Sequence, residues 1–176
     1  MLEVKRSVTV KRSREEVYKF WRQLENLPRF MQHLQDVRTT GERRSHWVAK
    51  GPAGTTIEWD AETTEDRPSH SIAWRSLEGS DVRNEGVVRF TQAPADRGTE
   101  VHVELRYDAP AGKLGTAVAN LFGEEPGQQI RDDLRRFKQV METGEVVLSD
   151  GSPEGAGQGV LKQRVAQPQE TAEVRS

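Results

Sequence analysis

The chain has 176 residues, of which 34% are hydrophobic and 31% charged, and its formal net charge at pH 7 is −2. It has no cysteine, which excludes disulfides, thiolate catalysis and cysteine metal sites. Residues 1–144 carry 23 acidic and 23 basic side chains, and this neutral balance argues against a nucleic-acid partner. There is no apolar run of the roughly 18–20 residues that span a membrane and no signal-peptide pattern, so we expect a cytoplasmic protein.

The first elements are predicted from alternation and from a helix cap. Apolar and polar residues alternate in residues 3–11, which predicts a strand with one buried face. Ser13 with Glu16 three residues later is a capping-box pattern, and apolar residues recur at helical spacing after it. Pro28 is typical of a first helical turn, so we expect it to open a second short helix. The apolar residues of that helix are Phe30, Met31 and Leu34.

Short alternating segments separated by Gly, Pro, Asp and Asn follow, and they predict six strands. These strands are expected at residues 36–41, 45–51, 55–66, 71–79, 83–93 and 99–108. Because the linkers between them are short, an antiparallel meander is favoured over parallel crossovers.

A helical period returns after Pro110. Leu121 and Phe122 belong to a first segment, which the stretch GEEPG interrupts. We expect a second, longer segment to run to about Thr143, with its charged residues, including Asp133, on a wet face. The apolar residues of this segment are Ile130, Leu134, Phe137 and Met141.

The sequence after this helix loses its periodicity. Residues 144–176 are rich in Gly, Gln, Glu, Ser and Pro, and they bury too little apolar surface to offset the entropy of ordering. We therefore expect one domain at residues 1–143 and a disordered tail at 144–176.

The order of one strand, two short helices, six strands and a long helix is an α+β layout. It resembles the helix-grip fold of the START-like (SRPBCC) superfamily, and within it the bacterial polyketide cyclase/dehydrase and coenzyme-Q-binding group. The resemblance implies a curved seven-stranded antiparallel sheet around the C-terminal helix, with a cavity between them for lipids, isoprenoid quinones or polyketides. It is carried by residues 8–37, 54–62, 72–79, 84–90, 98–105 and 121–138, among them GTTIEWDAE and LFGEEPGQQIRDDLRRFK.

Aromatic side chains on four predicted strands share the parity of inward apolar residues. They are Trp59, Trp74, Phe90 and Tyr107. They form either plain core or the wall of a cavity. Asn84 has the same parity, and together with Gly86 it indicates a bulge or a close approach and one polar contact in the cavity. If Gly51 pairs with Gly54, Val48 and not Trp47 faces inward, and a one-residue change in register reverses this.

Other residue types give no signal for catalysis or metal binding. The four histidines are scattered without the spacing of a zinc site, so we expect no metal. The carboxylates fit solvated strand and helix surfaces, so we expect no catalytic residue. Phosphate-binding and dinucleotide-binding glycine motifs are absent, and we expect no cofactor.

Together with the resemblance, these patterns favour non-catalytic binding of a hydrophobic small molecule. The resemblance implies that this molecule is a lipid, an isoprenoid quinone or a polyketide-like compound. The ligand would lie against the four strand aromatics, with Asn84 as polar contact, Leu121 and Phe122 on the helix side, and Phe30 and Met31 at the mouth. One alternative is a polyketide aromatase/cyclase-type enzyme, which needs an inward acid or base. Another is a protein-interaction module with a vestigial cavity. A peripheral membrane contact and a protein partner stay open.

Overall fold

The computed structural model describes residues 2–80, 82–108 and 126–144. Leu121, Phe122 and the predicted tail from residue 145 onward lie outside these ranges. The helices are α1 (Arg14–Arg22), the 3₁₀ helices η1 (Leu24–Arg29), η2 (Pro52–Gly54) and η3 (Pro94–Asp96), and α3 (Pro126–Thr143). The strands are β1 (Leu2–Val10), β2 (Leu34–Thr39), β3 (Arg44–Lys50), β4 (Thr56–Arg67), β5 (Ser71–Ser76), β6 (Arg83–Gln92) and β7 (Thr99–Asp108).

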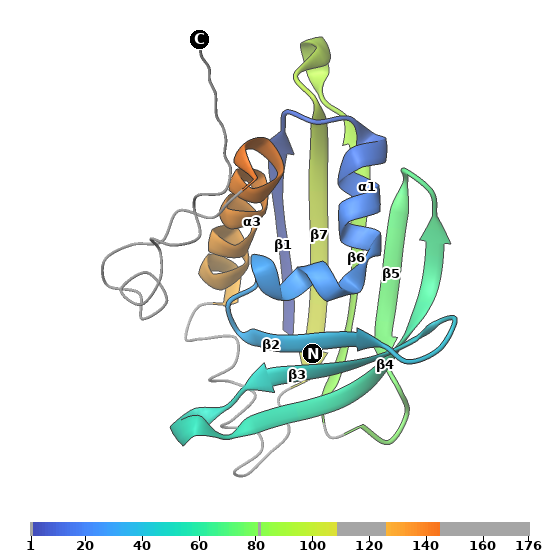
Figure 1. Cartoon of the computed structure of the whole chain (residues 1–176), viewed down its shortest axis with the longest axis vertical. Helices are drawn as coiled ribbons and strands as arrows, with labels where there is room; N and C mark the ends of the chain where they lie inside the picture. Colours follow the sequence, from blue (N-terminus) through green and yellow to red (C-terminus); the bar gives the residue numbers. More distant parts are fainter. Residues whose placement is uncertain (1, 81, 109–125, 145–176) are drawn as a thin grey trace, which may run out of the picture.

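All seven strands form one antiparallel sheet in the order β1-β7-β6-β5-β4-β3-β2. Strands β2 to β7 are a meander. Strand β1 is the edge strand next to β7 and pairs with it along its full length, from Leu2 with Tyr107 to Val10 with Thr99. The sheet curls strongly, so that β2 and β3 run across the direction of β1, β7 and β6, while α1 and α3 lie on the side toward which it curls (Figure 1). The predicted helix-grip α+β fold is confirmed.

The first helix begins as its capping box predicts. The Glu16 amide donates to Ser13 Oγ at 3.2 Å, and the Ser13 amide donates to Glu16 Oε1 at 3.2 Å. The prediction for the second helix is wrong in its bounds. Pro28 lies inside η1, which ends at Arg29, and Leu34 is already in β2. Because Leu34 pairs with Ala49 of β3, the chain has to leave the helical conformation before it.

An aromatic cluster fills the space between α1, η1, α3 and β6. Ring centroids of Trp21 and Phe30 lie 5.2 Å apart, those of Trp21 and Phe137 5.2 Å, and those of Phe30 and Phe137 4.9 Å. Phe90 of β6 joins the cluster through an edge contact with Trp21 at 6.4 Å. This cluster is the centre of the core, and it leaves the inner face of β3, β4 and β5 to a second set of aromatic residues.

Candidate ligand-binding face

Three tryptophans stack on the inner face of β3, β4 and β5. The Trp47 ring lies between the other two, 5.9 Å from Trp59 at an interplanar angle of 22° and 6.1 Å from Trp74 at 24°. All three side chains are buried. Such offset stacks of large flat rings provide a continuous apolar surface with the indole N–H groups at its edge.

The register of the β3–β4 hairpin brings Trp47 into this stack. Lys50 pairs with Thr56 and Trp47 with Trp59, and the Gly51 amide donates to the Thr55 carbonyl at 2.8 Å. Gly51 thus pairs with Thr55 rather than Gly54. Trp47 therefore faces the same side as Trp59, and the register that would have turned Val48 inward is excluded.

Small residues make room for the stack. Ser45 and Ala61 pair across β3 and β4, two residues from the Trp47–Trp59 pair on the same side of the sheet. Both residues are buried, and their side chains are small. Gly86 pairs with Trp74, and a Cβ on Gly86 would lie 2.5 Å from Trp74 Cζ2. The predicted close approach at Gly86 is therefore correct, with the Trp74 ring as the approaching group. The alternative that we considered, a bulge, is excluded, because β5 and β6 pair here without a shift of register.

Two buried donors beside the stack have no acceptor in the described part of the chain. They are Trp59 Nε1 and Asn84 Nδ2. The central indole of the stack, Trp47, does have a partner and donates to Ser45 Oγ at 2.8 Å. The Asn84 backbone amide donates to Ser76 Oγ at 3.1 Å, but this bond does not satisfy the side-chain amide. An unpaired buried donor is costly, so both N–H groups are candidates for contact with a bound molecule.

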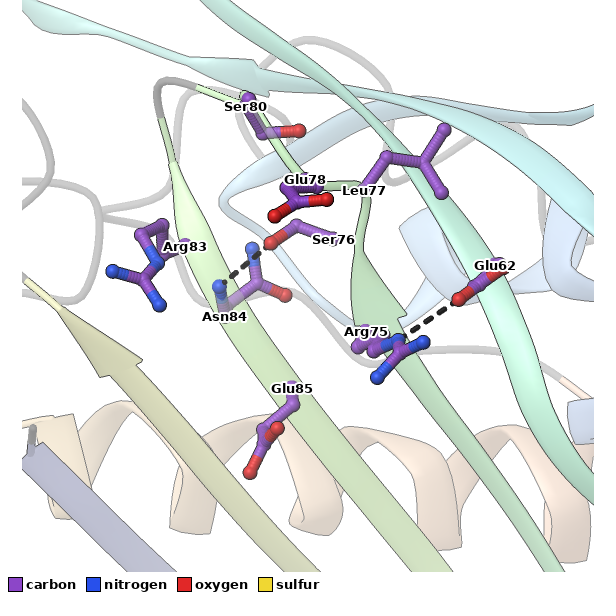
Figure 2. Close-up of a pocket in the computed structure, with 10 residues that line it drawn as sticks. Glu62, Arg75, Ser76, Leu77, Glu78, Ser80, Arg83, Asn84 and Glu85 are labelled. Carbon is purple, nitrogen blue, oxygen red and sulfur yellow. Dashed lines mark hydrogen bonds and ion pairs between the residues drawn. The ribbon is translucent and has the colours of Figure 1, made fainter.

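A pocket of about 760 Å³ opens where β5 and β6 separate toward their connecting loop. Ser76 and Asn84 lie together in it, with Glu78 close to them and Arg83 beyond (Figure 2). Arg75 and Glu62, which also line it, form an ion pair of 2.8 Å. The described lining is thus largely polar, whereas we predicted an apolar cavity under the C-terminal helix. Of the predicted site residues that the structure describes, Asn84 is the one that lines this pocket.

The other predicted site residues divide into two groups. Tyr107 pairs with Asn84 across β6 and β7, and burial raises the pKa of its phenol, so it stays neutral beside the stack. Phe90 belongs to the closed aromatic cluster. Phe30 and Met31 were expected at a mouth, but their side chains are 0% and 8% exposed. The burial of Phe30 follows from its contact with Phe137 of α3, at 4.9 Å between ring centroids, and a ligand contact of Phe30 and Met31 stays a prediction.

Comparisons with known proteins agree with this architecture. The model of the family described as polyketide cyclase/dehydrase and lipid transport matches residues 10–135. The chain belongs to this family. A 17.2 kDa protein of Streptomyces lincolnensis is 29% identical over 144 residues, which are 81% of this chain and 91% of that protein.

Solved structures of other proteins share the fold. A crystal structure from Deinococcus radiodurans is 41% identical, with a TM-score of 0.69 over 82% of this chain and 99% of that one. The di-domain ARO/CYC protein BexL from the BE-7585A biosynthetic pathway is 17% identical, with a TM-score of 0.57 over 81% of this chain and 48% of that one. At this low identity, the second comparison speaks for the fold alone.

Sequence reasoning missed two charged residues that the family fold turns inward. Arg6 has the parity of Val4 and Val8 on β1, and its guanidinium lies against Gly127 at the start of α3. Asp133 was assigned to the wet face of α3, but it is 1% exposed. A signal existed for both, since Arg6 alternates with the valines and Asp133 lies three residues after Ile130 and four before Phe137.

Asp133 joins α3 to the segment after η1. Asp133 accepts a hydrogen bond from Gln129 at 3.2 Å and forms an ion pair with Arg136 at 2.5 Å. Its Oδ2 lies 3.8 Å from His33 Nδ1. Arg136 also donates to the Phe30 carbonyl at 2.9 Å. Burial raises the pKa of Asp133 to about 6, and burial lowers the pKa of His33 to about 4.

The outer face of the sheet carries paired charges. Arg89 contacts Glu104 at 2.6 Å, and Arg106 contacts Glu3 at 3.1 Å and Glu85 at 3.2 Å. Within the described residues, no group of three or more His, Asp or Glu side chains suits a metal ion. No helix in the described ranges is long and apolar enough to cross a membrane.

Proposed function

We propose that this protein binds a hydrophobic small molecule with hydrogen-bond acceptors, such as an isoprenoid quinone, a polyketide-like compound or a lipid, and that it does so without catalysis. The observation that carries the proposal is the pair of buried, unpaired donors, Trp59 Nε1 and Asn84 Nδ2, beside the three stacked indoles. Leaving a buried donor unpaired costs about 1–3 kcal/mol. A ligand oxygen on each donor would remove that cost.

The spacing of the two donors suits a molecule of two or three rings. Asn84 is opposite Ser76, Ser76 pairs with Ala61, and Trp59 lies two residues before Ala61. Two strand spacings of about 4.8 Å and two residues of about 3.3 Å place the Cα atoms on the order of 12 Å apart. A flat molecule lying on the indoles reaches both donors, and its apolar area contributes about 25 cal/mol per Å².

Binding is favoured over catalysis by the chemistry next to the stack. Among the described residues, the buried polar or charged side chains are Ser45, Ser71, Asn84, Thr99 and Asp133. Asp133 is on α3, and Ser45, Ser71, Asn84 and Thr99 have no acid–base chemistry near neutral pH. The buried Tyr107 phenol has a raised pKa and stays neutral at that pH. A cyclase-type reaction needs an acid or base at the reacting atoms. Family membership is compatible with either activity, and the neutral surroundings of Trp59 favour a carrier or binding protein.

The test compares Trp59 with Trp21, whose indole N–H groups are both buried without a described acceptor but lie in different parts of the core. Trp21 Nε1 is also buried and unpaired, but it lies in the closed aromatic cluster. Uptake of a short-chain menaquinone and of an anthraquinone would be measured by fluorescence quenching and by native mass spectrometry after organic extraction. We expect W59F and N84L to weaken binding roughly 3–10-fold, the loss of one neutral hydrogen bond, and W21F to leave it unchanged.

Two results would overturn the proposal. One is an extracted wild-type protein that takes up neither quinone nor any compound from a mixed lipid pool. The other is equal weakening by W21F and W59F at unchanged folding, monitored by circular dichroism. In either case the indole stack is core, and the exposed surfaces become the place to search for function.

A further inference from the structure

Arg6 is a cation on the otherwise apolar inner side of β1. It pairs with Val103 of β7, and its neighbours on the same side of β1 and β7 are Val4, Val8 and Val101. Val4, Val101 and Val103 are buried. Arg6 as a whole is partly buried, but its Nε is fully buried, and a buried N–H has to be satisfied by a hydrogen bond or by an opposite charge.

No acidic partner of Arg6 lies within ion-pair distance among the described residues. Its Nη1 donates to the neighbouring Lys5 carbonyl at 2.7 Å, while its buried Nε has no acceptor. The outer-face arginines Arg75, Arg89 and Arg106 all have carboxylate partners. Within the described residues, these three outer-face arginines thus have carboxylate partners, and Arg6 on the inner face has none.

The start of α3 adds to this unbalanced positive charge. Gly127 is in the first turn of the 18-residue helix, and a Cβ there would clash with the Arg6 guanidinium. Because Gly127 has no side chain, the Arg6 guanidinium can lie directly against the helix backbone. The N-terminal end of a helix has a positive potential, so it does not compensate the arginine and itself favours an anion. One negatively charged group beside Arg6 would satisfy both the guanidinium and the helix end.

From these contacts we infer that the ligand is an amphipathic acid, whose carboxylate, sulfonate or phosphate group is bound by Arg6 while its flat apolar part lies on the indoles. This rests on the proposed function and narrows its ligand class. Trp74, Gly86, Leu105 and Val4 form one row across the sheet, and Arg6 lies two residues beyond Val4. Three strand spacings and two residues give a path on the order of 16 Å along the sheet, which its curvature shortens.

The test uses two fluorescent probes with the same aromatic skeleton. 1-Anilinonaphthalene-8-sulfonate is anionic, and N-phenyl-1-naphthylamine lacks the sulfonate. We expect the wild type to bind both, and R6Q to weaken the sulfonate probe at least about tenfold, as expected for a lost charge-assisted hydrogen bond, with the neutral probe within twofold. R6K retains the charge and should retain most of the preference. K5Q removes an exposed charge from the adjacent position on β1 and should change neither probe.

The outcomes separate this inference from the function on which it rests. If the wild type binds neither probe, both the ligand-binding proposal and the acid inference fall. If the neutral probe binds and R6Q affects both probes equally or neither, only the acid inference is overturned. Thermal unfolding of R6Q and R6K by circular dichroism ensures that the comparison is made on folded protein.

Discussion

The Trp74 ring lies directly over Gly86, its partner across β5 and β6, at a distance that leaves no room for a Cβ. The glycine does not have a positive φ, so its role here is to provide space. It lets the Trp74 indole lie flat toward Trp47, and the stack of three rings depends on that orientation.

Replacing Gly86 with alanine should therefore disturb the indole stack. The added methyl group has to displace the Trp74 ring, and overpacking of this kind costs about 1–3 kcal/mol. We expect a lower midpoint in urea and a changed near-ultraviolet circular dichroism signal from the coupled indoles. G41A is the control, because a Cβ at Gly41 would be 3.5 Å from its nearest neighbour, an ordinary contact. Similar spectra for G86A and wild type would show that the ring moves freely.

The hydrogen bond from Trp47 to Ser45 fixes the central ring of the stack. Both residues are buried, so S45A leaves the indole N–H without its acceptor. We expect a loss of about 1–3 kcal/mol of unfolding free energy. W47F removes the donor, so adding S45A to W47F should cost much less than S45A alone. A double-mutant cycle by urea unfolding measures this coupling, and strict additivity would contradict it.

The pair of Asp133, which is buried, and His33, whose side chain is 12% exposed, predicts opposing pH effects on stability. The pKa of Asp133 is raised to about 6, so its stabilising effect is present below its unfolded pKa of 3.8 and is lost as pH rises through about 6. The pKa of His33 is lowered to about 4, so its effect is present above 6.5 and is lost as pH falls through about 4. Between pH 4 and 6 the two contributions largely cancel.

Single substitutions should reveal each contribution. Relative to wild type, D133N should gain on the order of 2–3 kcal/mol of unfolding free energy between pH 4 and 7, and H33Q should lose a similar amount over the same range. Urea unfolding at pH 4, 5, 6 and 7 gives these differences directly. Arg136, which contacts Asp133, and Lys50, which lies near His33, are unchanged in both variants. Stability profiles parallel to that of wild type would contradict the assignment.

The capping box of α1 should have a measurable local effect. S13A removes the acceptor of the Glu16 amide and should cost about 1 kcal/mol, or roughly 2–4 °C in melting temperature for a chain of this size. S7A alters an exposed serine on β1 and should leave the melting temperature within about 1 °C. A melting temperature for S13A as close to wild type as that of S7A would show that the cap does not stabilise the native state.

Much of the fold was predictable from the sequence because it depends on local patterns. Alternation within each strand gives its buried face, and the short linkers leave the meander as the simple connection. The capping box marks the start of α1 in the same local way. By contrast, the bounds of η1 depend on Leu34 pairing with Ala49, a contact between separate segments. Residues 28–34 viewed alone are equally compatible with a helix.

The sequence by itself determined which residues share a side of each strand, including Trp59, Trp74 and Asn84. Only the tertiary structure decided which of them meet. The face of Trp47 depends on one hydrogen bond in a tight loop, since a one-residue slip turns every side chain of the strand over. Arg6 meets Gly127 because β1 closes the sheet on β7 and α3 packs across it. Such encounters depend on the packing of distant segments, which no local period encodes.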